Sequence, residues 1–322
     1  LFFVDLFFIN FCAPQLLNNF FSPMPKKPSN LIYGIDDKPP VATALILGLQ
    51  HVMVMFISVI FPVYIIHALG DSISLHDARS YVSLSMIAGG ITTILQSLKK
   101  GYIGSSYLCP SVSGPSYLSA SLLAAKTGGL SLLFGMTGFV GFVEVAFSRI
   151  MHKLRFLFPS EVTGVVVTLV GIVVIPMSVH NFFGLGFQDT NSEYKEIFVA
   201  LATFVIMIGL NIYSKGKLKL YCTILGMFSG YLLSFALGII TIKDIHELEG
   251  ASFFAIPYIE NMSWSFDARL VIPFIVAALC STFKTVGDIS TCQRINDEKW
   301  QRPDMKSVSG GIFADGLGGV IP

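Results

Sequence analysis

The 322-residue chain is 53% hydrophobic and 13% charged, with a formal net charge of +1. Soluble domains contain roughly 25% charged residues, so this chain has too few to cover a water-exposed surface. A net charge near zero gives no indication of nucleic-acid binding. The five cysteines are scattered and form no C-x-x-C pair, which favours small apolar helix residues over disulfide or metal partners. We therefore expect an all-α polytopic membrane protein with no cofactor and no metal.

The first 40 residues divide at Met24. Residues 1–23 have no basic flank and are interrupted by Asp5 and Pro14, so they match neither a signal peptide nor a membrane span. The sequence MPKKPSNLIYGIDDKPP, which starts at Met24, is typical of a cytoplasmic start. We expect residues 1–40 to be an N-terminal cytoplasmic segment in which residues 1–23 are read-through of upstream sequence; the alternative is a partial extra helix.

Apolar blocks of about 20 residues, the length that crosses a bilayer, follow in order. They lie at about 41–68, 81–98, 104–124, 130–150, 161–179, 196–213, 219–241, 270–291 and 307–322. The blocks predict eight spans and part of a ninth, because the sequence ends at GGVIP inside the last block. A helix that stopped inside the bilayer would leave backbone groups unpaired, so we expect a chain truncated after about 8.5 spans.

The loops between the blocks predict the orientation. With the N-terminus in the cytoplasm, fifteen Lys and Arg residues fall in inner segments and five (Arg79, Lys126, Lys195, Lys243 and Arg269) in outer ones. This alternation is a strong positive-inside pattern. The longest outer loop, at about 242–269, is acidic. We therefore expect a multi-pass protein of the cell inner membrane with a cytoplasmic N-terminus.

The third block is irregular, because Pro110, Gly114 and Pro115 occur within one short stretch. Proline removes a helix donor and clashes with the preceding turn, but it suits the first turn of a helix. We expect a strand up to about Val112 and a short helix that starts near Pro115. Broken helices at membrane depth occur where they line a cavity. The alternative is a proline kink in an ordinary packing helix.

The second and ninth blocks are similar. IAGGITTIL in block two and IFADGLGGVI in block nine are both rich in small residues, which favour close helix packing. Each follows a block with polar residues near its middle, Gln50 and His51 in the first and Lys284 and Asp288 in the eighth. The similar blocks are seven spans apart, which predicts two repeats of seven spans. Because seven is an odd number, the second repeat is inverted in the membrane.

Ionisable residues inside spans are candidates for function, because burying them costs several kcal/mol unless they are paired. Lys284 and Asp288 are spaced i, i+4 and share a helix face. They form either an internal salt bridge or a pair that lines the transport path, with Asp288 as the protonatable group. His51 is either a proton relay or a hydrogen-bonding residue in helix packing.

Three further carboxyl groups occur in or beside spans. Glu161 lies at a membrane edge, where we expect a helix cap or an interfacial role. Glu144 lies deeper, where we expect packing or pairing rather than substrate contact. Asp315 is either a packing residue beside Gly316 or a carboxyl group that faces a cavity.

Several motifs resemble the uracil/xanthine permeases, the nucleobase–ascorbate transporter family, over about residues 31–322. They are YGIDDKPP with LILGLQHVMVMF, GPSYL in the third block, FPSEVTGVVVTLVGIVVIP in the fifth and KTVGDIS in the eighth. The resemblance implies fourteen spans in two inverted repeats of seven. It implies core-domain spans 1–4 at 41–151, a gate domain of spans 5–7 at 152–241, an outer loop at 242–269, and incomplete core spans 8–9 at 270–322.

The resemblance also implies the site. Tyr117, next to Ser116, matches the aromatic position of the third span that contacts the base. Gln50 and His51 match the pair that supports the site, and Asp288 matches the aspartate tied to proton coupling. Lys284 stands where the family usually has a glutamate that accepts hydrogen bonds from the base, whereas a lysine can only donate them.

The resemblance thus implies a secondary active transporter, a proton- or sodium-coupled symporter for a purine-type nucleobase such as xanthine or urate, and a homodimer. Lys284 leaves three hypotheses: the substrate is an anionic or acceptor-rich base; the ammonium replaces the coupling cation and transport is uncoupled; or Lys284 pairs with Asp288 and the substrate is different. An anion exchanger of the same fold is an alternative. An intramembrane enzyme is disfavoured, because H-E-x-x-H and G-x-S-x-G motifs are absent.

Overall fold

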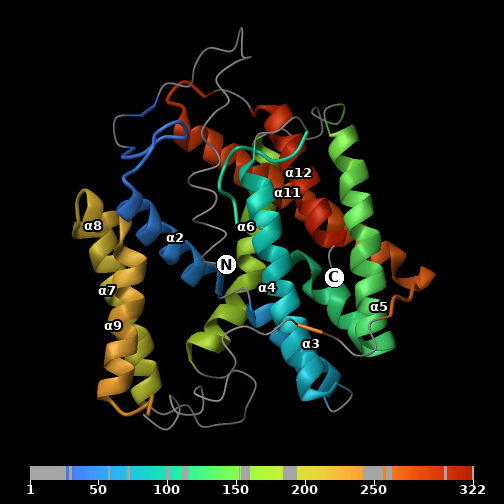
Figure 1. Cartoon of the computed structure of the whole chain (residues 1–322), viewed down its shortest axis with the longest axis horizontal. Coiled ribbons are helices and arrows are strands. Elements are labelled where there is room, and N and C mark those ends of the chain that lie inside the picture. Colours follow the sequence, from blue (N-terminus) through green and yellow to red (C-terminus); the bar gives the residue numbers. More distant parts are fainter. Residues whose placement is uncertain are drawn as a thin grey trace. The chain divides into compact units, whose positions relative to one another are not determined.

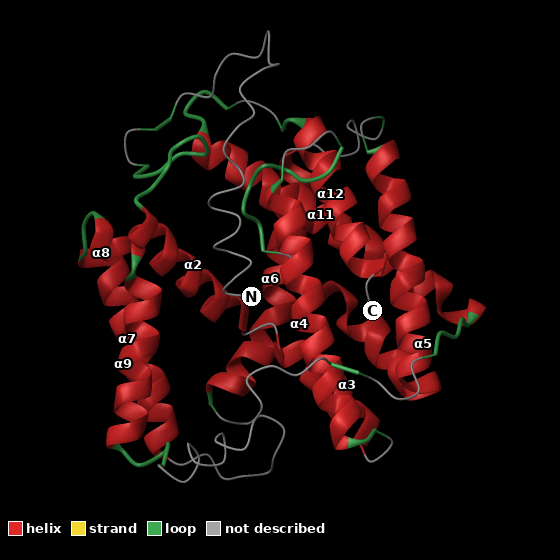
Figure 2. Ribbon diagram, in the orientation of Figure 1, coloured by secondary structure: helices red, strands yellow, loops and turns green. Residues whose placement is uncertain are grey.

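The computed structural model describes residues 27–28, 31–56, 59–70, 73–98, 102–110, 115–151, 153, 160–183, 194–241, 257–258, 263–300 and 303–320. The regular structure of these residues is helical and includes no β-strand (Figure 2). The all-α prediction is therefore confirmed. Residues 1–23 and most of the predicted outer loop at 242–269 lie outside the described residues.

The helices follow the apolar blocks in order (Figure 1). They are α2 (Val41–Phe56), α3 (Ile60–Leu69), α4 (Leu75–Ser97), α5 (Pro115–Ile150), α6 (Ser160–Phe182), α7 (Tyr194–Tyr213), α8 (Lys217–Leu220), α9 (Cys222–Ala236), the 3-10 turn η4 (Ala268–Leu270), α11 (Val271–Asn296) and α12 (Met305–Val320). Among the described residues, four stretches are long and apolar enough to cross a membrane: Val41–Leu69, Ser116–Ile150, Tyr194–Tyr213 and Ala268–Asn296. These lengths and compositions agree with a polytopic membrane protein.

The helix α5 contains a break that separates the third and fourth predicted spans. Gly128 and Gly129 have non-helical backbone angles, and Gly129 has φ 66° and ψ −160°. This region of backbone conformation is essentially restricted to glycine. The predicted separation of blocks 104–124 and 130–150 is therefore confirmed, and the first part of α5 is a short helix that begins at Pro115, as expected.

The segment before α5 differs from the prediction, because its described residues, 102–110, form an irregular chain rather than a strand. Three of its backbone N–H groups bond to carbonyl groups at the end of α4 and within α12. Gly104 N–H donates to the Gly310 carbonyl (3.0 Å), Ser105 N–H to the Gln96 carbonyl (2.8 Å), and Ser106 N–H to Leu98. These contacts satisfy groups that a membrane interior would leave unpaired. Residues 111–112, which complete the predicted strand, lie outside the described residues.

The chain divides into two compact units, of which the first comprises Leu1–Pro39, Met55–Gly171 and Pro257–Pro322. In this unit α5 packs against α3, α11 and α12, and α12 also packs against α4 and α11 (Figure 1). The core between them contains Ala124, Met136, Phe274 and Ala278, each fully inaccessible to solvent. These apolar contacts hold together the helices that line the site described below.

The packing of α5 on α12 depends on glycine. A Cβ at Gly141 would lie 2.6 Å from the Val320 nitrogen and 2.7 Å from the Gly316 oxygen. A Cβ at Gly316 would lie 2.8 Å from the Val145 nitrogen. Small residues allow membrane helices to approach closely in this way. The prediction that the small residues of block nine serve close packing is therefore confirmed.

The second unit comprises Pro40–Val54 and Ile172–Ile256. Within it α7 and α9 lie side by side (Figure 1), with Gly226 against Met207 and Gly230 against Thr203. The predicted division into core and gate domains stays a prediction.

Candidate functional site

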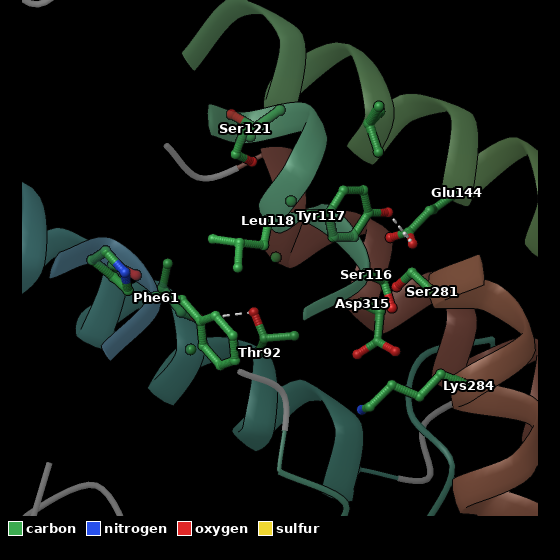
Figure 3. Close-up of a pocket in the computed structure, with 18 of the residues that line it drawn as sticks. Phe61, Thr92, Ser116, Tyr117, Leu118, Ser121, Glu144, Ser281, Lys284 and Asp315 are labelled. Atoms are coloured by element: carbon green, nitrogen blue, oxygen red, sulfur yellow. Dashed lines mark hydrogen bonds between the residues drawn. The ribbon is translucent and has the colours of Figure 1, made fainter. Parts of the chain in front are cut away.

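A cavity of about 210 Å³ lies inside the first unit (Figure 3). Its walls come from α3, α4, α5, α11, α12 and the segment before α5. The volume exceeds the roughly 150 Å³ of an apolar cavity that holds benzene, so a small planar molecule fits. The polar side chains in its lining are Tyr81, Ser85, Thr92, Gln96, Cys109, Ser116, Tyr117, Ser121, Thr137, Glu144, Ser281, Lys284, Thr285, Asp288 and Asp315.

The first turn of α5 forms one wall of the cavity through Ser116, Tyr117 and Leu118. Pro115 fixes the start of this helix, since a proline ring suits the first helical position. The first-turn N–H groups have no partner within the helix and give this end a partial positive charge. The Ser116 hydroxyl is buried and bonds to no other described residue. This end of α5 can therefore donate hydrogen bonds to a ligand with acceptor atoms.

Tyr117 is held by Glu144. The Tyr117 hydroxyl donates a 2.6 Å hydrogen bond to Glu144 Oε1, which comes from the far part of the same kinked helix (Figure 3). Glu144 is 3% exposed and lines the cavity. The expectation of pairing is confirmed for Glu144, but its place in the cavity wall was not predicted.

Lys284 and Asp288 form the ion pair that their spacing predicts. Lys284 Nζ lies 3.0 Å from Asp288 Oδ2, and the two side chains are 31% and 41% exposed. Both residues also line the cavity, with the lysine side chain extending into it (Figure 3). The salt bridge predicted from the sequence is therefore confirmed, and the pair also lines the cavity. A place on the transport path, with Asp288 as the protonatable group, stays a prediction.

Asp315 on α12 faces the same cavity. Its Oδ2 accepts a 2.6 Å hydrogen bond from the Thr285 hydroxyl, which lies on α11 beside Lys284. Figure 3 shows Asp315 between Ser281 and Lys284. Of the two alternatives for Asp315, the structure supports the cavity-facing carboxyl group.

The charges around the cavity do not balance. The lining has three carboxyl groups, Glu144, Asp288 and Asp315, and one ammonium group, Lys284. If all four were ionised, three negative charges and one positive charge would leave a net charge of −2 in the cavity wall. Such an excess is costly inside a membrane protein. Among the lining residues, Lys284 supplies the one basic group that can offset this charge.

Polar residues on α4 complete the wall and were not predicted. Ser85, Gly89, Thr92 and Gln96 are spaced by four, three and four residues and all line the cavity. Gln96 is 1% exposed, and its Oε1 accepts no hydrogen bond from the described residues. The signal in the sequence is the helical spacing of these polar and small residues within an apolar block.

Three predicted residues are not part of this cavity lining. Gln50 and His51 are half-buried on α2, in the second unit, and their role in the site stays a prediction. Glu161 lies in the first turn of α6, and its side chain lies outside the described part of the chain. In the described part, no group of three or more His, Cys, Asp and Glu side chains is placed to hold a metal ion.

A family profile described as "Permease family", which covers xanthine and uracil permeases, matches residues 42–322. The chain belongs to this family. It is similar to the xanthine permeases XanP (28% identity) and XanQ (29%) of Escherichia coli, each over 91% of this chain and 65% of the relative. It is also 28% identical to the uric acid permease PucJ of Bacillus subtilis, over 66% of this chain and 47% of the relative.

Family membership and the apolar helices identify a multi-pass membrane protein. The chain spans about 65% of the length of the two xanthine permeases. The matched region includes every residue that lines the cavity.

Proposed function

We propose that the chain forms a large part of a secondary active transporter for a purine-type nucleobase, with xanthine and urate as the first candidates. The observation that supports this most directly is the cavity between the first turn of α5 and the face of α11 that carries Lys284 and Asp288. Transporters place half-helix N-termini and polar side chains at such a site. The names of the relatives support the same class of substrate.

Tyr117 and Ser116 are the proposed contacts on one side of the base. The Tyr117 ring offers an aromatic face for stacking, and Glu144 fixes its orientation through the 2.6 Å hydrogen bond. We assign Glu144 as a positioning residue for this reason. The Ser116 hydroxyl and the N–H groups of the first turn are donors for the oxygens of a purine base.

Lys284 is the proposed specificity residue on the other side. It has three N–H donors and no acceptor, so it favours a base with acceptor atoms or negative charge. Urate is an anion at neutral pH, and xanthine loses a proton more readily than uracil does. The Asp288 carboxylate neutralises part of the lysine charge, so the preference is graded rather than absolute.

Coupling to a proton or sodium is proposed from the excess of carboxyl groups. Lys284 is paired with Asp288, which leaves Glu144 and Asp315 as additional acid groups in the wall. A cation that enters with the substrate would offset their charge. Proton uptake would involve Asp288, and the role of His51 as a proton relay stays a prediction from the sequence. An uncoupled facilitator, in which Lys284 replaces the cation, is the alternative that the ion pair supports.

The proposed setting is the inner membrane with a cytoplasmic N-terminus, as a homodimer in which the core moves against the gate. The experiment is uptake of labelled xanthine, urate and uracil by the full-length protein, in cells that lack other base transporters. We expect uptake of xanthine or urate that a proton or sodium ionophore abolishes. Uptake that an ionophore does not change would support the facilitator, and uptake of no base would refute the nucleobase assignment.

A further inference from the structure

Two cysteine thiols meet beside the cavity although 183 residues separate them in the sequence. Cys109 Sγ and Cys292 Sγ lie 3.5 Å apart. Cys109 belongs to the irregular segment before α5 and Cys292 to α11. Both are free thiols of intermediate exposure. The sequence pattern predicts that the cysteines are small apolar packing residues. The short distance between these two thiols indicates a further role.

The two cysteines are attached to the two walls of the cavity. Cys109 itself lines it, six residues before the start of α5 at Pro115. Cys292 follows Lys284 and Asp288 at i, i+4, i+8 spacing, so the three share one face of α11. A bond between these thiols would therefore join the segment that leads into Tyr117 to the helix face that presents Lys284.

We propose that Cys109 and Cys292 are an oxidisable dithiol that forms a disulfide and locks the cavity. A disulfide needs a sulfur–sulfur distance of about 2.05 Å, so the sulfurs must approach by about 1.5 Å. Peroxide is the oxidant in this proposal. One thiolate attacks hydrogen peroxide to give a sulfenic acid and hydroxide; the second thiolate then attacks the sulfenic sulfur and releases another hydroxide. Two protons from the thiols balance the hydroxides, so the sum is two thiols and one peroxide giving a disulfide and two waters.

The consequence for transport rests on the proposed function. The positive-inside pattern places Cys292 near the cytoplasmic end of its span, just before Arg294 and Lys299. Cytoplasmic thiols are kept reduced, and disulfides that form there are usually transient and redox-sensing. The dithiol is therefore the resting form, and the disulfide would stop uptake during oxidative stress by drawing the segment before α5 toward α11 and so changing the space between Tyr117 and Lys284.

The first test detects the bond without any measurement of transport. The full-length protein, with a protease site inserted between residues 242 and 250, is treated in membranes with hydrogen peroxide, alkylated with a maleimide and cleaved. We expect the two fragments to stay joined until a thiol reductant is added, and mass spectrometry to find a peptide that links Cys109 to Cys292. Cys109→Ser and Cys292→Ser should abolish the link, whereas the matched variant Cys280→Ser, in the same helix, should keep it.

The bond assignment is overturned if wild-type protein alkylates both thiols equally before and after peroxide, or if the fragments stay joined in Cys109→Ser. The mass of the linked wild-type peptide does not depend on whether a variant folds. The second test is the ratio of base uptake after peroxide to uptake before it. We expect loss of uptake that reductant restores in the wild type, and no loss on peroxide treatment in Cys292→Ser. A linked protein that transports at the untreated rate would overturn the lock, while absence of uptake before peroxide would count only against the proposed function.

Discussion

Replacing Tyr117 by phenylalanine removes one hydroxyl and keeps the ring. In the wild type this hydroxyl donates a 2.6 Å hydrogen bond to Glu144, which is 3% exposed. Loss of the donor leaves a buried carboxyl oxygen without this partner, which costs about 1–3 kcal/mol, with hydrogen bonds to charged groups at the upper end. We therefore expect Tyr117→Phe to lower the free energy of unfolding by about 1–3 kcal/mol, because the buried Glu144 carboxyl group loses its hydrogen-bond donor.

The assay is unfolding of the purified full-length protein by a denaturing detergent, with Tyr231→Phe as the control. Tyr231 is 59% exposed on α9, so the control should change the free energy of unfolding by less than about 0.5 kcal/mol. The double variant Tyr117→Phe/Glu144→Met should be more stable than Tyr117→Phe alone, because replacing both partners by apolar groups removes the unsatisfied atom. Equal effects of Tyr117→Phe and Tyr231→Phe, or an additive loss in the double variant, would refute the reasoning.

Two further predictions concern the helix crossing and the second carboxyl group. Gly141→Ala places a Cβ 2.7 Å from the Gly316 oxygen, so we expect a loss of about 1–3 kcal/mol in the free energy of unfolding. The control variant Gly209→Ala, whose Cβ meets nothing within 4 Å, should not destabilise the protein. Equal losses in the two variants would contradict close packing of α5 on α12. Thr285→Val removes the donor to Asp315 and should reduce uptake strongly, whereas Thr285→Ser keeps a hydroxyl and should retain it. A fully active Thr285→Val would show that this bond does not matter for transport.

The helices could be predicted from the sequence because each span is a property of a local stretch. Apolar length alone places α11, and the fixed φ of proline places the start of α5 at Pro115. The irregular segment at 102–110 was not predictable, because its backbone partners, such as Gln96 and Gly310, come from two other elements. A strand and an irregular chain of this length have similar local patterns.

The site was predictable where its members lie on one helix. The spacing of Lys284 and Asp288 is enough to predict their ion pair. The hydrogen-bond partners of Glu144 and Asp315 lie 27 and 30 residues away along the chain. Which residues meet at such separations depends on how the helical segments pack together. A single sequence does not contain that distance information, which is why Glu144 was expected to be a packing or pairing residue outside the site.

The central claim is that Lys284 determines which base the cavity accepts. The measurement is competition between labelled urate and labelled uracil for uptake by the full-length protein, in the wild type and in Lys284→Glu, with Lys126→Glu as a control on the exposed surface of α5. We predict that the wild type prefers urate. Lys284→Glu should shift the preference toward the neutral base, because the variant side chain accepts hydrogen bonds instead of donating them. Lys126→Glu should leave the ratio of urate to uracil uptake unchanged. An unchanged ratio of urate to uracil uptake in an active Lys284→Glu protein would contradict the claim.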